Sequence, residues 1–318
     1  MLEIKNLSKH YTIRESGALA NIFSTPKRKL KAVDDVSFAV TEGETVGLVG
    51  ESGCGKTTLG RTIVKLIEPT GGEVYFEGKN VFGLNNAELK TYRKKVQIIF
   101  QDPYSCLNPR MKIESVVTEG LVIHSELKGV HRKQKAKELL ELVGLSGELA
   151  GKYPHEFSGG QRQRIGIARA VSLNPSYIIC DEPVSSLDVS VQAQIINLLI
   201  DLQEKFKLGY IFISHDLSVV RYLSHKIAVM YLGKLVEFAD TAELFSNPLH
   251  PYTKLLFSSL PEEHKKNKAE INDISAAAAG GGCLFYPRCP EAKPECGETV
   301  PELKEINGGH KVSCINLK

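Results

Sequence analysis

Short apolar runs alternate with longer amphipathic stretches along much of the chain. The runs at residues 44–49, 96–100, 177–180 and 210–213 contain few polar positions, and a stretch with apolar residues at helical spacing, 195–202, separates the last two. Strands that are apolar on both faces are typical of a parallel sheet covered by helices. The pattern therefore predicts an α/β fold with a mostly parallel sheet at its core.

The first part of the chain is richer in strands. Residues 2–7 alternate apolar and polar side chains like an edge strand, and 33–40 and 71–76 predict two more strands. The polar stretch 14–31 is expected to be a long surface loop. Residues 109–151 are expected to be mostly helical, and within them 133–143 carry apolar side chains at helical spacing.

The composition is that of a globular protein with balanced charge. Of 318 residues 42% are hydrophobic, and 40 basic residues stand against 37 acidic ones, for a net charge of +3. A dedicated nucleic-acid binder carries a strong basic excess, so nucleic acid is not expected as a partner. No apolar run approaches the roughly 18 residues that span a bilayer, and residues 1–5 lack the apolar core of a secretion signal. We expect a chain that stays in the cytosol.

A phosphate-binding loop follows the apolar run 44–49. The sequence from Gly50 to Thr57 has the form G-x-x-x-x-G-K-T, in which glycines let successive backbone N–H groups converge on phosphates. Lys56 would place its charge between the β and γ groups, and the Thr57 hydroxyl would bind Mg²⁺. The loop therefore predicts binding of ATP with Mg²⁺. The residues expected to contact the nucleotide are Gly50, Ser52, Gly53, Cys54, Gly55, Lys56, Thr57 and Thr58.

Two adjacent carboxylates, Asp181 and Glu182, directly follow the apolar run 177–180. They would lie at the carboxyl edge of the sheet, where open α/β sheets bind their ligands. Asp181 is expected to hold Mg²⁺, and Glu182 is expected to activate the attacking water. Together with the phosphate loop upstream, this pair predicts an enzyme that hydrolyses the nucleotide.

The segment from Phe157 to Gln161 resembles the signature sequence of ATP-binding-cassette ATPases, with Phe at a position where Leu is commoner. Ser158 and the amides of Gly159 and Gly160 would form an anion site at a helix N-terminus. Other segments resemble the landmarks of this family in the same order along the chain. They are the glutamine loop at Gln101-Asp102-Pro103, the D-loop at Ser186-Leu187-Asp188 and the switch histidine at His215.

This resemblance implies a P-loop ATPase of the cassette class. Its mostly parallel core would be joined by an antiparallel β subdomain, an inserted helical subdomain at about 102–160 and a small Cys-rich C-terminal extension. The resemblance also implies that Gln101 senses Mg²⁺ and the attacking water, that His215 holds the γ-phosphate, and that Tyr11 stacks on adenine. Two subunits would sandwich two ATP molecules, each phosphate loop facing the signature of the other subunit. The facing residues are then Ser158, Gly159, Gly160, Gln161 and Asp188.

Two further segments, Asn247 to Leu256 and Phe285 to Ala292, resemble the ATPase subunits of dipeptide and oligopeptide importers. This implies an ATPase domain over residues 1–260 that lies at the cytoplasmic face of the membrane and docks on two permease subunits. Its other partners would be a second ATPase subunit, either a paralogue or another copy, and indirectly an extracytoplasmic peptide-binding protein. ATP hydrolysis would then power peptide import. The alternatives are a soluble cassette ATPase acting on the ribosome or DNA, and an iron–sulfur-regulated ATPase.

The last segment, residues 261–318, is expected to be a linker followed by a small domain. Its cysteines are Cys283, Cys289, Cys296 and Cys314. Disulfides are not expected in the cytosol, so this group indicates metal binding. Cys289-Pro290 is similar to the Cys-Pro step of bacterial ferredoxins, and some peptide-importer subunits carry a 4Fe-4S cluster here. A 4Fe-4S cluster is expected, with Zn²⁺ or unligated thiols as the alternatives. The low-complexity stretch 276–282 departs from the Pro-containing linker that is usual in such proteins.

Overall fold

The structure is a computed structural model of the chain that describes residues 1–13, 28–102, 104–124, 131–258 and 281–317. The chain divides into two compact units. The helical unit contains residues 1–2, 40–47 and 76–224, and the β-rich unit contains residues 3–39, 48–75 and 225–318. The strand β3 (Thr45–Val49) passes from the first unit into the second.

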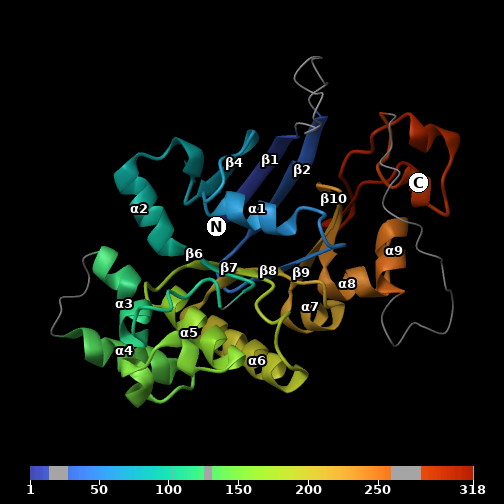
Figure 1. Cartoon of the computed structure of the whole chain (residues 1–318). Helices are drawn as coiled ribbons and strands as arrows, with labels where there is room; N and C mark the ends of the chain where they lie inside the picture. Colours follow the sequence, from blue (N-terminus) through green and yellow to red (C-terminus); the bar gives the residue numbers. More distant parts are fainter. Residues whose placement is uncertain (14–27, 103, 125–130, 259–280, 318) are drawn as a thin grey trace, which may run out of the picture. The chain divides into compact units, whose positions relative to one another are not determined.

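Three parallel strands form the core of the helical unit (Figure 1). β7 (Tyr177–Asp181) lies between β8 (Gly209–Ile213) and β6 (Val96–Ile99), and every residue of β7 and β8 is buried. The register pairs Cys180 with Ile99 on one side and with Phe212 on the other, so the three strands end at the same edge. The prediction of a parallel core made of apolar strands is confirmed.

Helices surround these strands within the helical unit. α5 packs against β6, and α3 and α4 both pack against α5. The helices and the short strand of this unit are β5 (Lys79–Asn80), α2 (Asn86–Lys95), α3 (Ile113–Ile123), α4 (Arg132–Leu142), α5 (Gly159–Val171), α6 (Val189–Phe206) and α7 (Leu217–Leu223). The helical prediction for 109–151 is thus met by α3, α4 and a 3₁₀ turn at Gly147–Gly151, with residues 125–130 outside the described part.

Antiparallel strands dominate the β-rich unit. β9 (Lys226–Tyr231) pairs with β10 (Lys234–Asp240), and β10 also pairs with β12 (His310–Val312), which pairs in turn with β11 (Lys304–Asn307). β1 (Leu2–Ile13) lies between β2 (Arg28–Val40) and β4 (Gly71–Phe76). The helices of this unit are α1 (Lys56–Ile63), α8 (Thr241–Ser246) and α9 (Pro251–Phe257).

The prediction of a surface loop at 14–31 is wrong for its last four residues, which form a strand. Residues 14–27 lie outside the described part, but Arg28 to Lys31 belong to β2. Lys29 and Leu30 are exposed within that strand. Main-chain pairing with β1 decides the conformation here, because such pairing outweighs the weak strand preference of individual polar residues.

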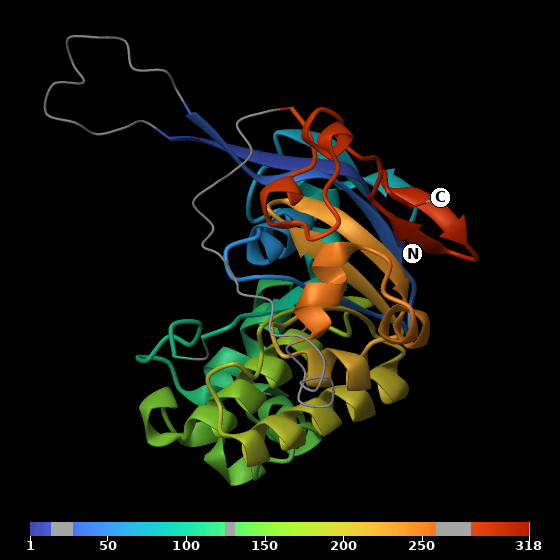
Figure 2. The ribbon, with the colours of Figure 1, turned by 90° about the vertical axis from the view of Figure 1, so that its right-hand side faces the viewer.

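A buried carboxylate joins β10 to the C-terminal tail, residues 281–317, which lies beside this strand in Figures 1 and 2. Glu237 of β10 is fully buried. Its Oε1 accepts a hydrogen bond from the Leu249 N–H at 2.7 Å and lies 2.8 Å from Nε2 of His310 on β12. Its Oε2 accepts from the His250 N–H at 3.0 Å. A buried carboxylate with this many donors is well compensated for the loss of water, so Glu237 holds the tail strand in place.

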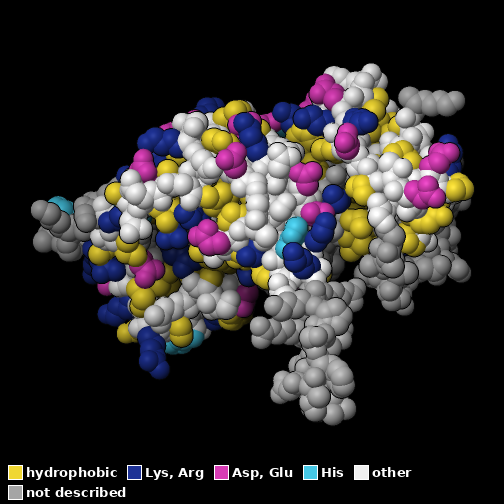
Figure 3. Space-filling model, turned by 90° about the horizontal axis from the view of Figure 1, so that it is seen from above, with side chains coloured by type: hydrophobic (Ala, Val, Ile, Leu, Met, Phe, Trp, Pro, Cys, Tyr) yellow, Lys and Arg dark blue, Asp and Glu magenta, His cyan; other side chains and the backbone are white. Residues whose placement is uncertain are grey.

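Charged side chains of both signs are scattered among apolar and other groups on the face of the molecule shown in Figure 3. Basic and acidic groups lie among one another there, in agreement with the small net charge. Within the described ranges, no helix combines the length and the apolar character that crossing a membrane requires.

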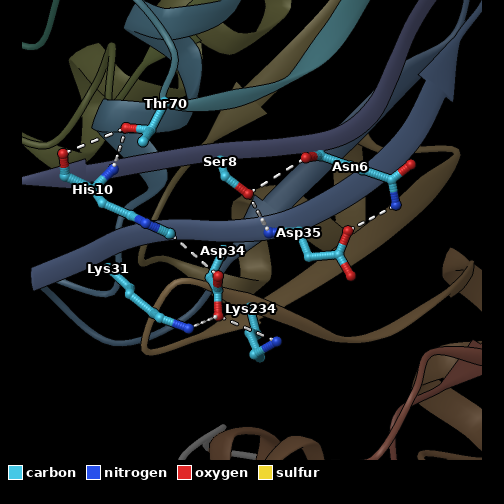
Figure 4. Close-up of polar contacts among 8 residues, drawn as sticks. All are labelled: Asn6, Ser8, His10, Lys31, Asp34, Asp35, Thr70 and Lys234. Carbon is cyan, nitrogen blue, oxygen red and sulfur yellow. Dashed lines mark hydrogen bonds and ion pairs between the residues drawn. The ribbon is translucent and has the colours of Figure 1, made fainter. Parts of the chain in front are cut away.

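Three basic side chains contact the carboxylate of Asp34 on β2 (Figure 4). Its Oδ2 lies 3.2 Å from Nζ of Lys31 and 3.2 Å from Nζ of Lys234, and its Oδ1 lies 3.2 Å from Nε2 of His10. Burial acts to raise the pKa of Asp34, but the charges of Lys234 and Lys31 and their hydrogen bonds outweigh it. The pKa of Asp34 is therefore lowered from its ordinary value of 3.8, and the ionised form stabilises the fold.

We expect Asp34→Asn to lower the free energy of unfolding by about 2 kcal/mol at pH 7, because a half-buried cluster of cations loses its counter-charge. A lowered pKa contributes stability above the unfolded-state pKa and loses it as the pH falls through the folded-state pKa. The difference between wild type and variant should therefore shrink below about pH 4. Urea unfolding at pH 7, 5 and 3.5 measures this.

The neighbouring Asp35→Asn is the matched control. Asp35 is exposed and has a φ of 63°, a conformation that Asn tolerates, so its stability should change by less than about 0.5 kcal/mol. Equal losses in the two variants, or a loss that does not depend on pH, would contradict the role given to Asp34.

Candidate functional site

The predicted phosphate loop lies between β3 and α1 in the β-rich unit. α1 begins at Lys56, and Gly55 precedes it with a φ of 110° and no side chain that caps the helix. The first N–H groups of a helix have no partner within the helix, and together with the helix dipole they favour an anion. The loop and the start of α1 therefore have the geometry of a phosphate site, with Thr57 and Thr58 on the first turn.

Glycine is required at two positions of this loop. A Cβ on Gly55 would lie 1.9 Å from the carbonyl oxygen of Ala32, and a Cβ on Gly50 would lie 2.1 Å from that of Met230. Gly53 also has a positive φ, of 77°, but no atom lies within 4 Å of the position its Cβ would take. Close packing against neighbouring strands thus fixes Gly55 and Gly50, whereas only the backbone conformation favours glycine at Gly53.

Lys56 folds back over the loop. Its Nζ donates to the carbonyl oxygens of Gly50 at 2.7 Å and Glu51 at 2.9 Å. Cys54, one of the predicted nucleotide contacts, is buried, and this burial raises the pKa of its thiol. Cys54 is 3% exposed, so a phosphate would meet its backbone, whose N–H donates to the Glu51 carbonyl at 3.2 Å.

The three predicted catalytic residues meet in the helical unit. The Nε2 of Gln101 donates to Oε2 of Glu182 at 2.9 Å, and Nδ1 of His215 lies 3.3 Å from the same oxygen. Each residue follows a different strand: Gln101 comes after β6, Glu182 after β7 and His215 after β8. The parallel register carries the three strand ends to one edge, and this brings the side chains together.

Glu182 has a strained backbone. Its φ is 46°, in the left-handed region that residues with a side chain rarely adopt, and its N–H donates to the Ile213 carbonyl at 3.0 Å. Such a conformation costs about 1–2 kcal/mol and is found where function directs a side chain. The side chain of Glu182 is 17% exposed and that of His215 is 60% exposed, so the carboxylate lies at the base of the group and the imidazole at its surface. Asp181, the last residue of β7, is 1% exposed.

The predicted signature begins α5. Ser158 is the N-cap: its Oγ accepts from the Gln161 N–H at 3.4 Å, and its own N–H donates to Oε1 of Gln161 at 3.0 Å. A Cβ on Gly160 would lie 2.4 Å from a methyl group of Val191 on α6. An added Cβ would force the Val191 side chain to shift, because the signature packs against the start of α6, which follows the exposed Asp188. Gly159 similarly adjoins the D-loop, with 3.4 Å between its Cβ position and the Leu187 side chain.

Tyr11, the predicted adenine contact, lies near the end of β1. Its ring is 38% exposed, and Nζ of Lys9 lies 5.1 Å from the ring centroid. An exposed aromatic face beside a cation suits stacking on a base.

The four tail cysteines lie in one small region. The Cys283 N–H donates to the Cys296 carbonyl at 2.8 Å, and burial raises the pKa values of Cys283, Cys289 and Cys314, with smaller contributions from the charges of neighbouring tail thiols. All four are free thiols. In the part of the chain that the structure describes, however, no three His, Cys, Asp or Glu side chains gather closely enough to hold a metal ion. Among these described residues, the structure therefore gives neither the predicted 4Fe-4S site nor the alternative Zn²⁺ site any support.

One group of contacts to the loop was not predicted. Arg288 and Tyr252 both bind Glu51, the residue after Gly50. Both residues lie in segments that were noted in the sequence only for their resemblance to peptide-importer subunits. No spacing pattern connects them to Glu51, because 237 positions separate Arg288 from it along the chain.

Two family descriptions match the chain. Residues 33–185 match the family described as ABC transporter, and residues 236–296 match the family described as the C-terminal region of oligopeptide/dipeptide transporters. The first match contains the phosphate loop, the signature, Gln101 and Glu182.

Characterised relatives match over nearly the whole chain. The oligopeptide transport ATP-binding protein AppF of Bacillus subtilis is 49% identical over 322 residues, which cover 99% of this chain and 96% of AppF. OppF of the same organism, also described as an oligopeptide transport ATP-binding protein, is 49% identical over 323 residues, with 100% and 97% covered.

Solved structures share the fold. The ATP-binding cassette MJ0796, in a dimeric post-hydrolysis state bound to ADP and Pi, gives a TM-score of 0.65 at 30% identity and covers 76% of this chain and 99% of its own. The cbiO1 protein of Clostridium perfringens gives 0.64 at 24% identity, which supports the fold alone. Fold and site together define an ATPase of the ATP-binding-cassette class. Within that class, the chain belongs to the family of ATP-binding proteins of oligopeptide and dipeptide transporters.

We expect Gly55→Ala to be far more disruptive than Gly53→Ala. Both substitutions place a Cβ on a backbone with positive φ, which costs about 1 kcal/mol or slightly more. Only the first drives the Cβ into a main-chain carbonyl, so its loss of unfolding free energy should reach about 3 kcal/mol. Urea unfolding of the two variants compares them, and losses of equal size would refute the packing constraint at Gly55.

Proposed function

We propose that the chain is the ATP-hydrolysing subunit of a membrane importer of di- or oligopeptides. The relatives support this, because AppF and OppF are named as oligopeptide transport ATP-binding proteins. Within the chain, the observation that carries the proposal is the contact of Gln101 and His215 with a single oxygen of Glu182. A carboxylate, an amide and an imidazole at one strand edge are the groups that activate water and stabilise a phosphoryl transition state.

In the proposed reaction, Glu182 accepts a proton from the water that attacks the γ-phosphate. The bond between the γ-phosphorus and the bridging oxygen breaks, and ADP and phosphate leave. Gln101 orients the water, and His215 stabilises the charge that develops on the γ-phosphate oxygens. Because phosphoryl transfer depends mostly on positioning and electrostatics, the strand register that groups these side chains is the main contribution of the fold.

The phosphate loop would bind the rest of the nucleotide. Lys56 would exchange its bonds to the Gly50 and Glu51 carbonyls for the β and γ groups, while the loop N–H groups surround the phosphates. Tyr11 would stack on the base. The proposed phosphate contacts are Gly50, Ser52, Gly53, Cys54, Gly55, Lys56, Thr57 and Thr58, and the proposed Mg²⁺ ligands are Thr57, Gln101 and Asp181.

A second cassette would complete each nucleotide site. The proposed contacts from that subunit are Ser158, Gly159, Gly160, Gln161 and Asp188. The signature suits this role, since it begins α5 with an exposed Ser158 and a helix N-terminus favours an anion. The dimeric state described for MJ0796 also supports it. ATP binding would close the pair and hydrolysis would reopen it, whether the second subunit is a paralogue or another copy.

The closing movement would drive two permease subunits, with this chain bound at the cytoplasmic face of the membrane and an extracytoplasmic binding protein delivering the peptide. Residues 1–260 would form the ATPase domain, including a helical subdomain at about 102–160, and residues 261–318 the linker and tail. Co-purification with the permease and stimulation of ATP hydrolysis by peptide test this assignment. Co-purification with ribosomes or DNA instead would favour the soluble alternative.

Replacing Glu182 by Gln should leave MgATP binding within about threefold of wild type but reduce the steady-state hydrolysis rate at least about 100-fold. The variant loses the base, whereas the phosphate loop is untouched. Equilibrium binding and phosphate release measure the two effects separately. The same variant should also accumulate as the ATP-bound dimer in gel filtration.

Glu138→Gln is the matched control, since Glu138 is an exposed carboxylate of the same unit whose side chain contacts Lys135 and Gln134 on its own helix. Its hydrolysis should stay at the wild-type rate. Normal turnover in Glu182→Gln would remove Glu182 from the role of base.

The 4Fe-4S cluster stays a separate proposal drawn from the sequence. Its support is that four thiols lie in one short tail region, although their arrangement does not form a site. Anaerobic purification followed by iron and sulfide analysis tests it. About four iron atoms per chain, lost in Cys289→Ser, would support the cluster. Stoichiometric Zn²⁺ or no metal would reject it.

A further inference from the structure

The C-terminal tail reaches the phosphate loop through one arginine. Arg288 ends the short 3₁₀ helix Tyr286–Arg288, and its guanidinium forms a bidentate pair with the Glu51 carboxylate. Nη2 donates to Oε1 at 2.8 Å, and Nη1 donates to Oε2 at 3.0 Å. The side chain of Arg288 is only 10% exposed and that of Glu51 is 28% exposed. Bidentate pairs of this kind are among the stronger and more directional polar contacts in proteins, because two parallel hydrogen bonds fix the geometry.

Every polar group of Glu51 makes a hydrogen bond. Its N–H donates to the Tyr252 hydroxyl oxygen at 2.9 Å, and its carbonyl oxygen accepts from Nζ of Lys56 at 2.9 Å. The carbonyl also accepts from the Cys54 N–H at 3.2 Å. The tail therefore binds the side chain of Glu51, and the carbonyl oxygen of the same residue accepts a hydrogen bond from Lys56.

An aromatic cluster fixes the arginine in place. The rings of Tyr231, Tyr252 and Phe285 lie 4.6 to 5.5 Å apart, and the guanidinium lies 5.8 Å from the centroids of Tyr231 and Phe285. The Tyr231 hydroxyl adds a contact to Nη1 at 3.4 Å. The hydrogen bonds that Arg288 donates to Glu51 raise the pKa of Arg288 further, so the cation persists at every working pH.

The charge of Glu51 poses a problem for a phosphate site. A carboxylate in the loop repels an incoming triphosphate, and a partly buried position weakens the screening by water. The contact with Arg288 neutralises that carboxylate and directs it toward the tail. It also keeps the Glu51 backbone, and with it the carbonyl that binds Lys56, in one conformation.

We propose that Arg288 is a positioning residue for the phosphate loop: by pairing with Glu51, the C-terminal tail sets the affinity of the site for MgATP. This inference rests on the proposed function. It assigns to the tail a part in the nucleotide site itself, in addition to any part in docking.

The test measures the dissociation constant of the full-length chain for the magnesium complex of AMP-PNP, a non-hydrolysable ATP analogue. Arg288→Ala should raise this constant about tenfold, because the unpaired Glu51 carboxylate then faces the phosphates. Adding Glu51→Gln to Arg288→Ala should bring the constant back to within about threefold of wild type, since the repelling charge is gone. In ATPase assays, Arg288→Ala should raise KM by a similar factor and change kcat by less than about twofold.

Lys254→Ala is the matched control. Lys254 of α9 pairs with Glu291 of the tail at 3.1 Å, but both side chains are about half exposed and neither contacts the loop. This variant also removes one cation and one contact between tail and body, and its nucleotide affinity should stay at the wild-type value. Arg288→Lys keeps the charge but loses the bidentate geometry, so it should raise the dissociation constant by only about threefold. This variant replaces Arg288→Ala in the test if Arg288→Ala does not fold.

Three outcomes would overturn the proposal. One is an Arg288→Ala variant that binds the analogue as tightly as Lys254→Ala. Another is a double variant no tighter than Arg288→Ala, which would place the effect outside Glu51. The third is a lower thermal unfolding midpoint in Arg288→Ala with unchanged affinity, which would make the pair purely structural. If wild type itself binds no MgATP, the proposed function fails as well, and this result is distinct from the other three.

Discussion

The parallel register of β6, β7 and β8 is the constraint on which the grouping of Gln101, Glu182 and His215 depends. Each strand delivers one polar residue just past its end, and the register places those ends on a single edge. A shift of one strand by one residue would turn its side chains to the opposite face and separate Glu182 from Gln101 and His215. Because every residue of β7 and β8 is buried, such a shift would also expose apolar side chains to water. Core packing and site geometry are therefore enforced by the same interactions.

The phosphate loop depends on a different kind of constraint. It has no strand register of its own, and its conformation is set by what packs around it. Gly55 adjoins the Ala32 carbonyl, Gly50 adjoins the Met230 carbonyl, and Glu51 is held by Tyr252 and Arg288. A loop shaped in this way by β2, β9, α9 and the tail is preorganised, so less binding energy is spent on ordering it when a nucleotide arrives.

Local sequence was sufficient wherever the partners lie within one helical turn or one strand. Ser158 lies at the helix N-terminus that the sequence predicted, and it pairs with Gln161, three residues further on, to cap α5. The buried strands were predictable for the same reason, since four or five consecutive apolar residues have few alternatives to a buried strand. The four cysteines mark the limit of such reasoning, because closeness in sequence did not translate into a coordinating geometry.

The sequence by itself determined the class of fold and, through the short pattern G-x-x-x-x-G-K-T, the position of the loop glycines and Lys56. It also indicated three candidate catalytic residues, Glu182 by its place after an apolar strand, and Gln101 and His215 by resemblance to the family. Only the tertiary structure decided which of these residues touch. Gln101 and Glu182 stand 81 positions apart, and Glu51 and Arg288 stand 237 apart. Contacts over such distances arise from strand register and from the packing of the tail against β10. Neither of these produces a periodic pattern in the sequence. The contact between the tail and the phosphate loop could therefore be identified only from the tertiary structure.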